Sequence, residues 1–111
     1  MIVLDTNVVS EIWRDRSDPN VADWVGRQER SRLFLCIPVI AELSYGATRT
    51  LLRDRSARYR KALEAMVEGG YRNRILPFDL PSATKYGEIV ARRESVGHPF
   101  GPLDAMIAAI C

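Results

Sequence analysis

The stretch LFLCIPVIAELSYGA, residues 33–47, changes its hydrophobic pattern partway along its length. Residues 33–37 are apolar at consecutive positions, which is typical of a strand buried on both faces of a parallel sheet. After Pro38 the apolar residues recur at helical spacing, at Val39, Ile40, Leu43 and Ala47. The stretch therefore predicts a buried strand that leads directly into a helix.

Two further apolar runs of the same kind lie at residues 1–4 and 74–78. The segments between the runs show helical patterns, which we expect at about residues 8–14, 19–29, 82–95 and from near 102 to the end. Right-handed crossovers between parallel strands then predict an α/β fold, a three-layer α/β/α domain around a central parallel sheet.

An arginine-rich amphipathic stretch follows the helix that begins after Pro38 and stops at Gly69-Gly70, a helix C-terminal signal. One face of this stretch is expected to carry the apolar residues Leu52, Tyr59, Ala62, Leu63 and Met66. Its basic residues, Arg49, Arg53, Arg55, Arg58, Arg60 and Lys61, most simply form a solvated helix face, and contact with RNA is the alternative.

The length of 111 residues suits a single domain, residues 1–111. We expect no membrane span, because no apolar run is long enough, and no secretory signal, because no basic region precedes an apolar stretch. Cys36 is expected to be a buried free thiol, which favours a cytoplasmic location. The net charge of +2 is weak evidence, but arginine dominates the basic residues and makes an anionic partner such as RNA plausible.

The last expected helix ends on apolar residues, without a glycine or a basic last turn. Three strands are also few for a parallel sheet that must shield both edges. From these patterns we expect the domain to be incomplete at its C-terminus and to lack its last strands.

Three carboxylates occupy comparable positions in this scheme. Asp5 directly follows the first strand, Glu42 lies in the first turns of the helix after the second strand, and Asp104 lies in the first turn of the last helix. Sites in open α/β sheets form beyond the carboxyl ends of the strands. Clustered carboxylates repel one another unless a cation lies among them, and such hard oxygen ligands favour Mg²⁺ or Mn²⁺. We therefore expect the three acids to converge so that one ion could contact all of them.

Structural interpretations compete with this one. Asp5, Thr6 and Asn7 are all good N-cap residues, and Asp104 is favoured near a helix start by the helix dipole alone. Glu42 interrupts an apolar series, where a buried acid is costly without a partner, so for this residue alone a functional and a structural role are equally plausible.

The segments IVLDTNVVSE (2–11), FLCIPVIAELSYG (34–46) and GPLDAMIAA (101–109) resemble, in order, the three acid-bearing motifs of PIN-domain toxins of the VapC type. The resemblance spans the chain and includes ILPFD (75–79), which is similar to the family's third strand. It implies a metal-dependent endoribonuclease that hydrolyses RNA phosphodiesters, the toxin of a toxin–antitoxin pair.

By that resemblance Asp5, Glu42 and Asp104 are catalytic metal ligands for Mg²⁺ or Mn²⁺, and Thr6 supports the site through its hydroxyl. It also implies a cognate antitoxin, and a sheet in which a later strand would lie beside the first, so that Ile2-Val3-Leu4 is expected at an unpaired edge. Because this edge and the last helix would leave apolar surface uncovered, we expect a homodimer or tight association with the antitoxin. Trp13 becomes a candidate for partner contact, although core packing is the default for Trp13 and Trp24. His98, in a loop, is assigned no role.

Two other interpretations remain open on the sequence. The chain could be a catalytically weak or inactive module that binds an antitoxin or dimerises, because the family's further acid has no counterpart in it. It could also be a PIN-type nuclease acting on DNA, because 2′-OH recognition leaves no motif.

Overall fold

The computed structural model describes residues 1–99 and 101–111. Its sheet has the strand order β1-β2-β3, with β1 at Ile2–Val3, β2 at Leu33–Cys36 and β3 at Ile75–Leu76. Both pairings are parallel, with Ile2 opposite Leu33 and Leu35 opposite Ile75. This confirms the predicted parallel strands and the edge position of β1, although β1 and β3 are shorter than the apolar runs that contain them.

Six α-helices lie in the described residues: α1 (Thr6–Trp13), α2 (Pro19–Arg27), α3 (Ile37–Asp54), α4 (Arg58–Ala65), α5 (Leu80–Ser95) and α6 (Pro102–Ile110). A 3-10 turn, η1 (Arg30–Arg32), precedes β2, and a π-helical turn, η2 (Met66–Gly70), follows α4. Three of the helices begin at an aspartate whose side chain accepts a backbone N–H: Asp5, Asp18 and Asp79. Caps of this type satisfy backbone donors that a helix start leaves unpaired.

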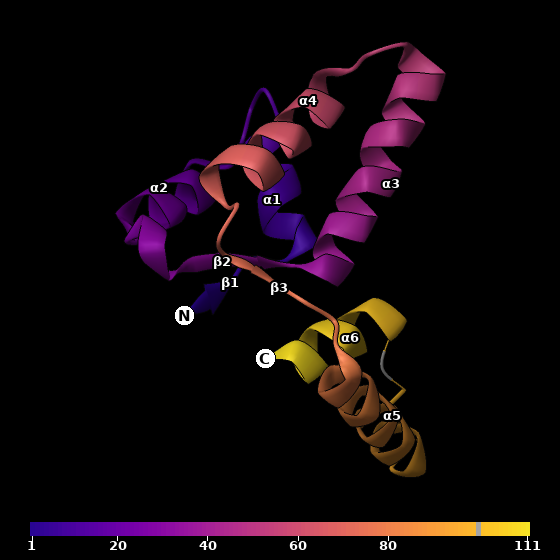
Figure 1. Ribbon diagram of the computed structural model, residues 1–111. Helices are drawn as coiled ribbons and strands as arrows, with labels where there is room; N and C mark the ends of the chain where they lie inside the picture. The colour runs from indigo at the N-terminus through magenta and orange to yellow at the C-terminus, as the bar shows by residue number, and fades with distance from the viewer. Residues whose placement is uncertain (100) are drawn as a thin grey trace.

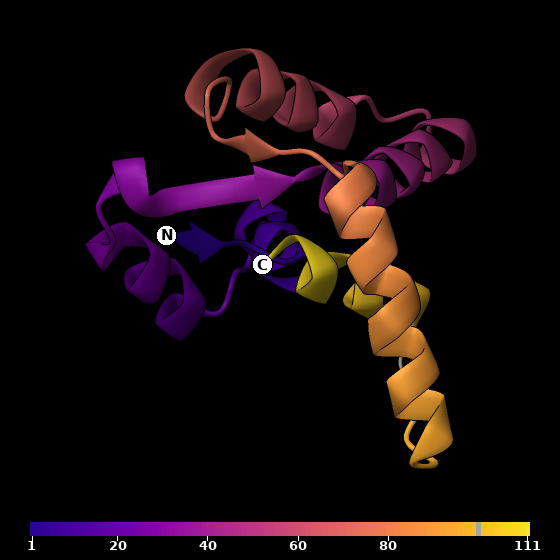
Figure 2. The ribbon, with the colours of Figure 1, turned by 60° about the horizontal axis from the view of Figure 1, so that its bottom comes forward.

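The helices lie on both sides of the strands, as the three-layer prediction requires. Figure 1 shows α1, α3 and α4 on one side of the strands, with α6 and the start of α5 on the other. In both views α5 extends away from the rest of the molecule, with α6 lying against it (Figures 1 and 2).

The core lies around β2, the middle strand. Its fully buried large side chains are Leu4, Val9, Leu35, Cys36 and Val39, and Ile107 and Ile110 of α6 pack against this cluster. Burial of each such aliphatic side chain contributes about 1.5–3 kcal/mol. Cys36 is free and buried as expected, and burial raises the pKa of its thiol above the ordinary value.

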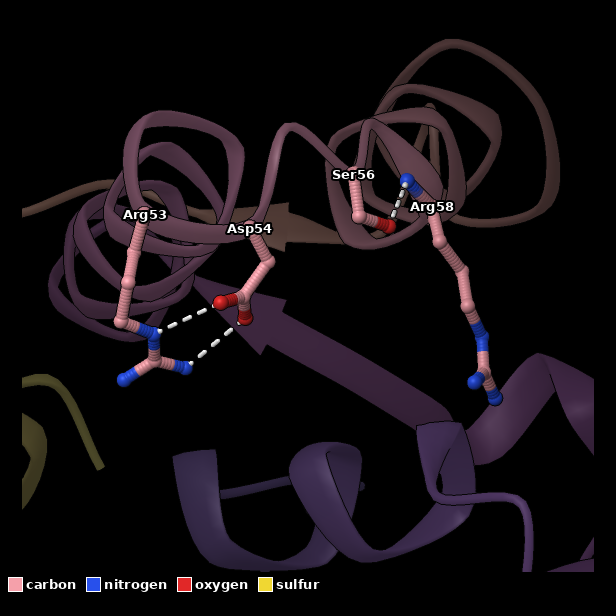
Figure 3. A network of polar contacts seen from close by, with 4 residues as sticks. All are labelled: Arg53, Asp54, Ser56 and Arg58. Atoms are coloured by element: carbon pink, nitrogen blue, oxygen red, sulfur yellow. Dashed lines mark hydrogen bonds and ion pairs between the residues drawn. The ribbon is translucent and has the colours of Figure 1, made fainter.

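One sequence prediction about the arginine-rich stretch is wrong. The helix after β2 continues through Leu52 to Asp54, and Leu52 is 78% exposed rather than on an apolar face shared with Tyr59. The chain then turns at residues 55–57, where Arg55 adopts a left-handed conformation with φ of 54°. Figure 3 shows the polar contacts around this turn, in which the Arg53 guanidinium donates twice to Asp54 at 3.1 Å.

No helix in the described part of the chain combines the length and hydropathy needed to cross a membrane.

Candidate functional site

A cleft of about 410 Å³ opens between α1, α3 and α4. The cleft is lined by Thr6, Ser10, Trp13, Arg14, Glu42, Leu43, Tyr45, Gly46, Ala47, Arg49, Thr50 and Tyr59. Two of the residues singled out from the sequence, Thr6 and Glu42, therefore share one cavity, together with two arginines and three aromatic rings. This combination of one acid, cations and aromatic rings distinguishes the cleft from the shallower hollows of the surface.

Asp5 lies where β1 passes into α1. Its Oδ1 accepts the Val8 backbone N–H at 2.9 Å, so the N-cap role considered from the sequence is present. The side chain is exposed and lines a separate, more open hollow of about 470 Å³ with Glu11, Arg14 and Asp18. Arg14 lines both this hollow and the cleft, so the two adjoin at this residue.

Glu42 is exposed, which corrects the premise that it is buried among apolar neighbours. The buried stripe of α3 runs through Val39, Leu43 and Ala47, and Glu42 lies beside this stripe at the mouth of the cleft. Among the described residues Glu42 has neither an ion pair nor a hydrogen bond through its carboxylate, so no protein cation neutralises it. Because Glu42 is exposed, its charge carries no burial penalty, so the sequence argument from a costly buried acid does not apply to it.

Asp104 lies in the first turn of α6, whose N-cap is Gly101, and its side chain is exposed. It too has no side-chain hydrogen bond or ion pair within residues 1–99 and 101–111. Helix α6 contacts α3 as well as α5, and α3 contacts α1. The three acids thus stand near the starts of three helices that pack in the order α1, α3, α6.

This arrangement does not bring the three carboxylates together as expected. Across the described residues, no three Asp, Glu, His or Cys side chains lie closely enough to hold a metal ion. The expectation that one ion could contact Asp5, Glu42 and Asp104 is therefore not met by the side-chain positions of this structure. Asp5 instead caps α1 through Oδ1 and lines a different hollow from Glu42.

The donor chemistry of the region nevertheless suits a hard cation. Thr6 Oγ1 is buried and has no hydrogen-bond partner, and it lines the same cleft as Glu42. A buried hydroxyl without a partner costs free energy, which a bound ion or its water could recover. Because Glu42 and Asp104 are exposed and have no ion pair or side-chain hydrogen bond among the described residues, rotation of either carboxylate toward a cation would break no polar contact.

Two stacked rings line the same cleft. Trp13 and Tyr59 have centroids 5.9 Å apart and an interplanar angle of 16°. Arg58 holds these rings in place, because it donates to the Trp13 carbonyl oxygen at 2.6 Å and pairs with Asp15 at 2.7 Å. One member of the basic set is therefore a structural residue that ties α4 to the end of α1.

Sequence reasoning missed the parts of the cleft that depend on contacts between distant residues. Tyr45 and Tyr59 were not singled out for a site, although Tyr45 lies within the segment FLCIPVIAELSYG and Tyr59 lies within the arginine-rich stretch. Trp24, by contrast, lies outside the cleft, and His98 is exposed in its loop.

Comparison with known proteins places this geometry in a family. The family model described as PIN domain matches residues 2–111. The chain is 36% identical over 109 residues to the VapC ribonuclease Y4jK of Sinorhizobium fredii, an alignment that covers 98% of this chain and 78% of that protein.

Two solved structures are similar in fold as well as in sequence. The crystal structure of FitAcB from Neisseria gonorrhoeae aligns with a TM-score of 0.83 and 31% identity, covering 99% of this chain and 79% of the other. The DNA-bound VapBC of Salmonella typhimurium aligns with a TM-score of 0.72 and 29% identity, covering 96% and 75%.

Proposed function

The chain belongs to the PIN-domain family, and from this premise we propose that it is a metal-dependent endoribonuclease, the toxin of a toxin–antitoxin pair. The observation that carries the proposal is the placement of Asp5, Glu42 and Asp104 near the starts of three helices that pack in series. The name of the Sinorhizobium fredii relative, a VapC ribonuclease, supports RNA as the substrate.

Asp5, Glu42 and Asp104 are proposed as the residues that hold Mg²⁺ or Mn²⁺. All three are exposed, and Asp5 keeps its Oδ2 available while Oδ1 caps α1. When bound, such a cation stabilises negative charge on a phosphodiester and activates the attacking water. The unpartnered Thr6 hydroxyl supports the site as a further hydrogen-bonding group beside Glu42.

The arginines at the cleft orient the substrate in this proposal. Arg14 and Arg49 both line the cleft that contains Glu42. Guanidinium groups bind phosphate through paired N–H donors, so they can hold an RNA backbone beside the acids. Their role is to position the scissile phosphate and to offset repulsion between the carboxylates and the RNA.

A cognate antitoxin and a second copy of the chain are the proposed protein partners. The VapBC neighbour, solved as a DNA-bound complex, supports a paired assembly for this chain. DNA remains the alternative substrate, and an inactive binding module remains the alternative role.

Cleavage of labelled single-stranded RNA and DNA of the same sequence tests the proposal. We expect the purified chain to cleave RNA in Mg²⁺ and not in EDTA, and Asp5→Asn, Glu42→Gln and Asp104→Asn each to reduce the rate more than about 100-fold. Asp23→Asn, an exposed acid on α2, is the matched control and should leave the rate unchanged.

The other outcomes discriminate between the alternatives. Cleavage of DNA in preference to RNA would assign a DNA nuclease. Absence of cleavage of either strand by a folded chain would favour the binding module. Normal cleavage by any one of the three acid variants would remove that residue from the proposed site.

A further inference from the structure

The cleft wall contributed by α3 carries an acid, an aromatic ring and an arginine in succession, Glu42, Tyr45 and Arg49. Residues three and four apart on a helix lie on the same face, so these side chains form one stripe along the cleft. The rise of a helix places Glu42 and Arg49 about 10 Å apart along its axis. Any ligand that lies along this stripe and reaches the proposed catalytic acid also reaches Tyr45.

Tyr45 contributes little to the core. Its side chain is 65% exposed, and its ring contacts the Arg49 guanidinium, whose central carbon lies 5.4 Å from the ring centroid. An exposed aromatic ring beside an arginine is the combination with which proteins bind unpaired nucleotides, because the ring stacks on a base and the guanidinium contacts phosphate.

We propose that Tyr45 and Arg49 form a subsite for one unpaired nucleotide next to the scissile phosphate. The Tyr45 ring stacks on the base, and Arg49 contacts the phosphate on the side away from Glu42. The subsite makes the chain selective for single-stranded over duplex RNA, because a base within a duplex has no free face for the ring. This proposal rests on the proposed function, since it takes Glu42 as a catalytic acid.

The charge of the cleft and the stacked rings that line it favour a nucleotide over a peptide. Arg14 and Arg49 make it suited to an anion. The stacked pair Trp13 and Tyr59 lines the same cleft as Tyr45, and Arg58 donates to the Trp13 carbonyl oxygen, so the cleft offers further aromatic surface for a base.

Binding is measured by fluorescence anisotropy with a labelled single-stranded RNA in EDTA, where cleavage does not occur. We expect Tyr45→Ala and Arg49→Ala each to weaken binding about 10-fold or more, and Tyr45→Phe, which keeps the ring, to stay within about 3-fold of the original chain. Arg92→Ala, an exposed arginine on α5, is the charge-matched control and should change little. Annealing the RNA to its complement should remove the difference between the original chain and Tyr45→Ala.

Steady-state cleavage separates a binding role from a catalytic one. Tyr45→Ala should raise KM with little change in kcat, because the stack forms equally in the ground state and the transition state. Unchanged thermal unfolding of both variants should accompany this result, since Tyr45 and Arg49 are exposed.

Several outcomes would overturn the subsite. The first is that the original chain binds no single-stranded RNA. The second is that Tyr45→Ala and the original chain bind RNA with equal affinity. The third is that Tyr45→Ala loses affinity only for a protein partner, which would make the cleft a peptide groove. Failure of the nuclease proposal looks different: RNA binding would still depend on Tyr45, but neither the original chain nor any variant would cleave.

Discussion

The part of the molecule built on the sheet and the α5–α6 arm are held in place by different means. In the first part, residues 1–76, large side chains such as Leu35 and Val39 are completely buried around β2. In the arm, residues 80–110, the buried positions among the described residues are small, namely Ser82, Ala105 and Ala109. The arm joins the core mainly through α6, whose Ile107 and Ile110 contact it.

This difference bears directly on the candidate site. Asp5 and Glu42 belong to the sheet-based part, whereas Asp104 belongs to the arm. The distance between Asp104 and the other two acids therefore depends on how α6 seats against α3. A cation site that needs all three acids would couple metal binding to the position of the arm.

The largest expected effect distinguishes the two parts by their burial. Leu35→Ala removes a fully buried side chain from the middle strand and should lower the free energy of unfolding by about 2–5 kcal/mol. Leu80→Ala, at a residue that is 80% exposed at the start of α5, should change it by less than about 0.5 kcal/mol. Urea denaturation followed by circular dichroism measures the free energy of unfolding of both variants. Equal losses in the two variants would contradict the difference in burial between the two parts.

A smaller effect is expected where the arm meets the rest. Ala105 is fully buried in α6, so Ala105→Leu should overpack the contact and destabilise the protein by about 1–3 kcal/mol. Because the substitution also displaces the neighbouring Asp104, Mn²⁺ affinity should fall even under conditions where the chain remains folded. Unaltered Mn²⁺ affinity in the folded variant would show that the seating of α6 does not matter for the site.

A substitution at Arg58 tests how α4 is attached to α1 within the sheet-based part. Arg58→Ala removes the hydrogen bond to the Trp13 carbonyl and the pair with Asp15, whose side chain is 83% exposed. We expect a loss of only about 1 kcal/mol in unfolding free energy, since water screens exposed pairs. The geometry of the cleft should change more than the stability does. Near-ultraviolet circular dichroism would report the change in the Trp13–Tyr59 pair, and an unchanged spectrum would contradict the role of Arg58 in holding these rings.

The smallest expected effect concerns the start of the arm. The Ser82 hydroxyl and backbone N–H donate to Asp79 Oδ1 at 2.8 and 3.1 Å, and they hold the pKa of Asp79 below its ordinary value. A carboxyl whose pKa is lower in the folded state stabilises that state above its unfolded pKa, about 4, and loses this contribution as the pH falls through the folded pKa.

Amide exchange at the first turn of α5 should therefore accelerate as the pH is lowered below about 4, after correction for the intrinsic exchange rate. Asp79→Asn should remove this pH dependence. If amide exchange in the first turn of α5 showed the same pH dependence in Asp79→Asn and in the original chain, Asp79 would not control the stability of that turn.

The sequence was sufficient for the fold because its signals are local. Consecutive apolar residues marked β2, and Asp18 followed by Pro19 marked the start of α2. The turn at residues 55–57 escaped prediction because it contains neither glycine nor proline, and Arg55 adopts the left-handed conformation without a sequence signal for it. Local patterns thus located the helices and strands, but they did not locate the boundary between α3 and α4 at residues 55–57.

The site was predictable only in part. The three acids could be named from their places in the expected elements, but the exposure of Glu42 follows from the exact stripe that α3 buries, through Val39 and Leu43. The Trp13–Tyr59 pair depends on packing between residues far apart in the chain, which no local pattern encodes. The orientation of Asp5 toward its helix also follows from backbone geometry rather than residue type.

Direct titration of Mn²⁺ into the metal-free chain, followed by electron paramagnetic resonance, tests the central claim that acids from both parts hold one cation. We expect saturable binding that weakens at least about 10-fold in Asp5→Asn, in Glu42→Gln and in Asp104→Asn, with Asp23→Asn unchanged. Binding that survives Asp104→Asn at full strength would contradict a site shared between the sheet-based part and the arm.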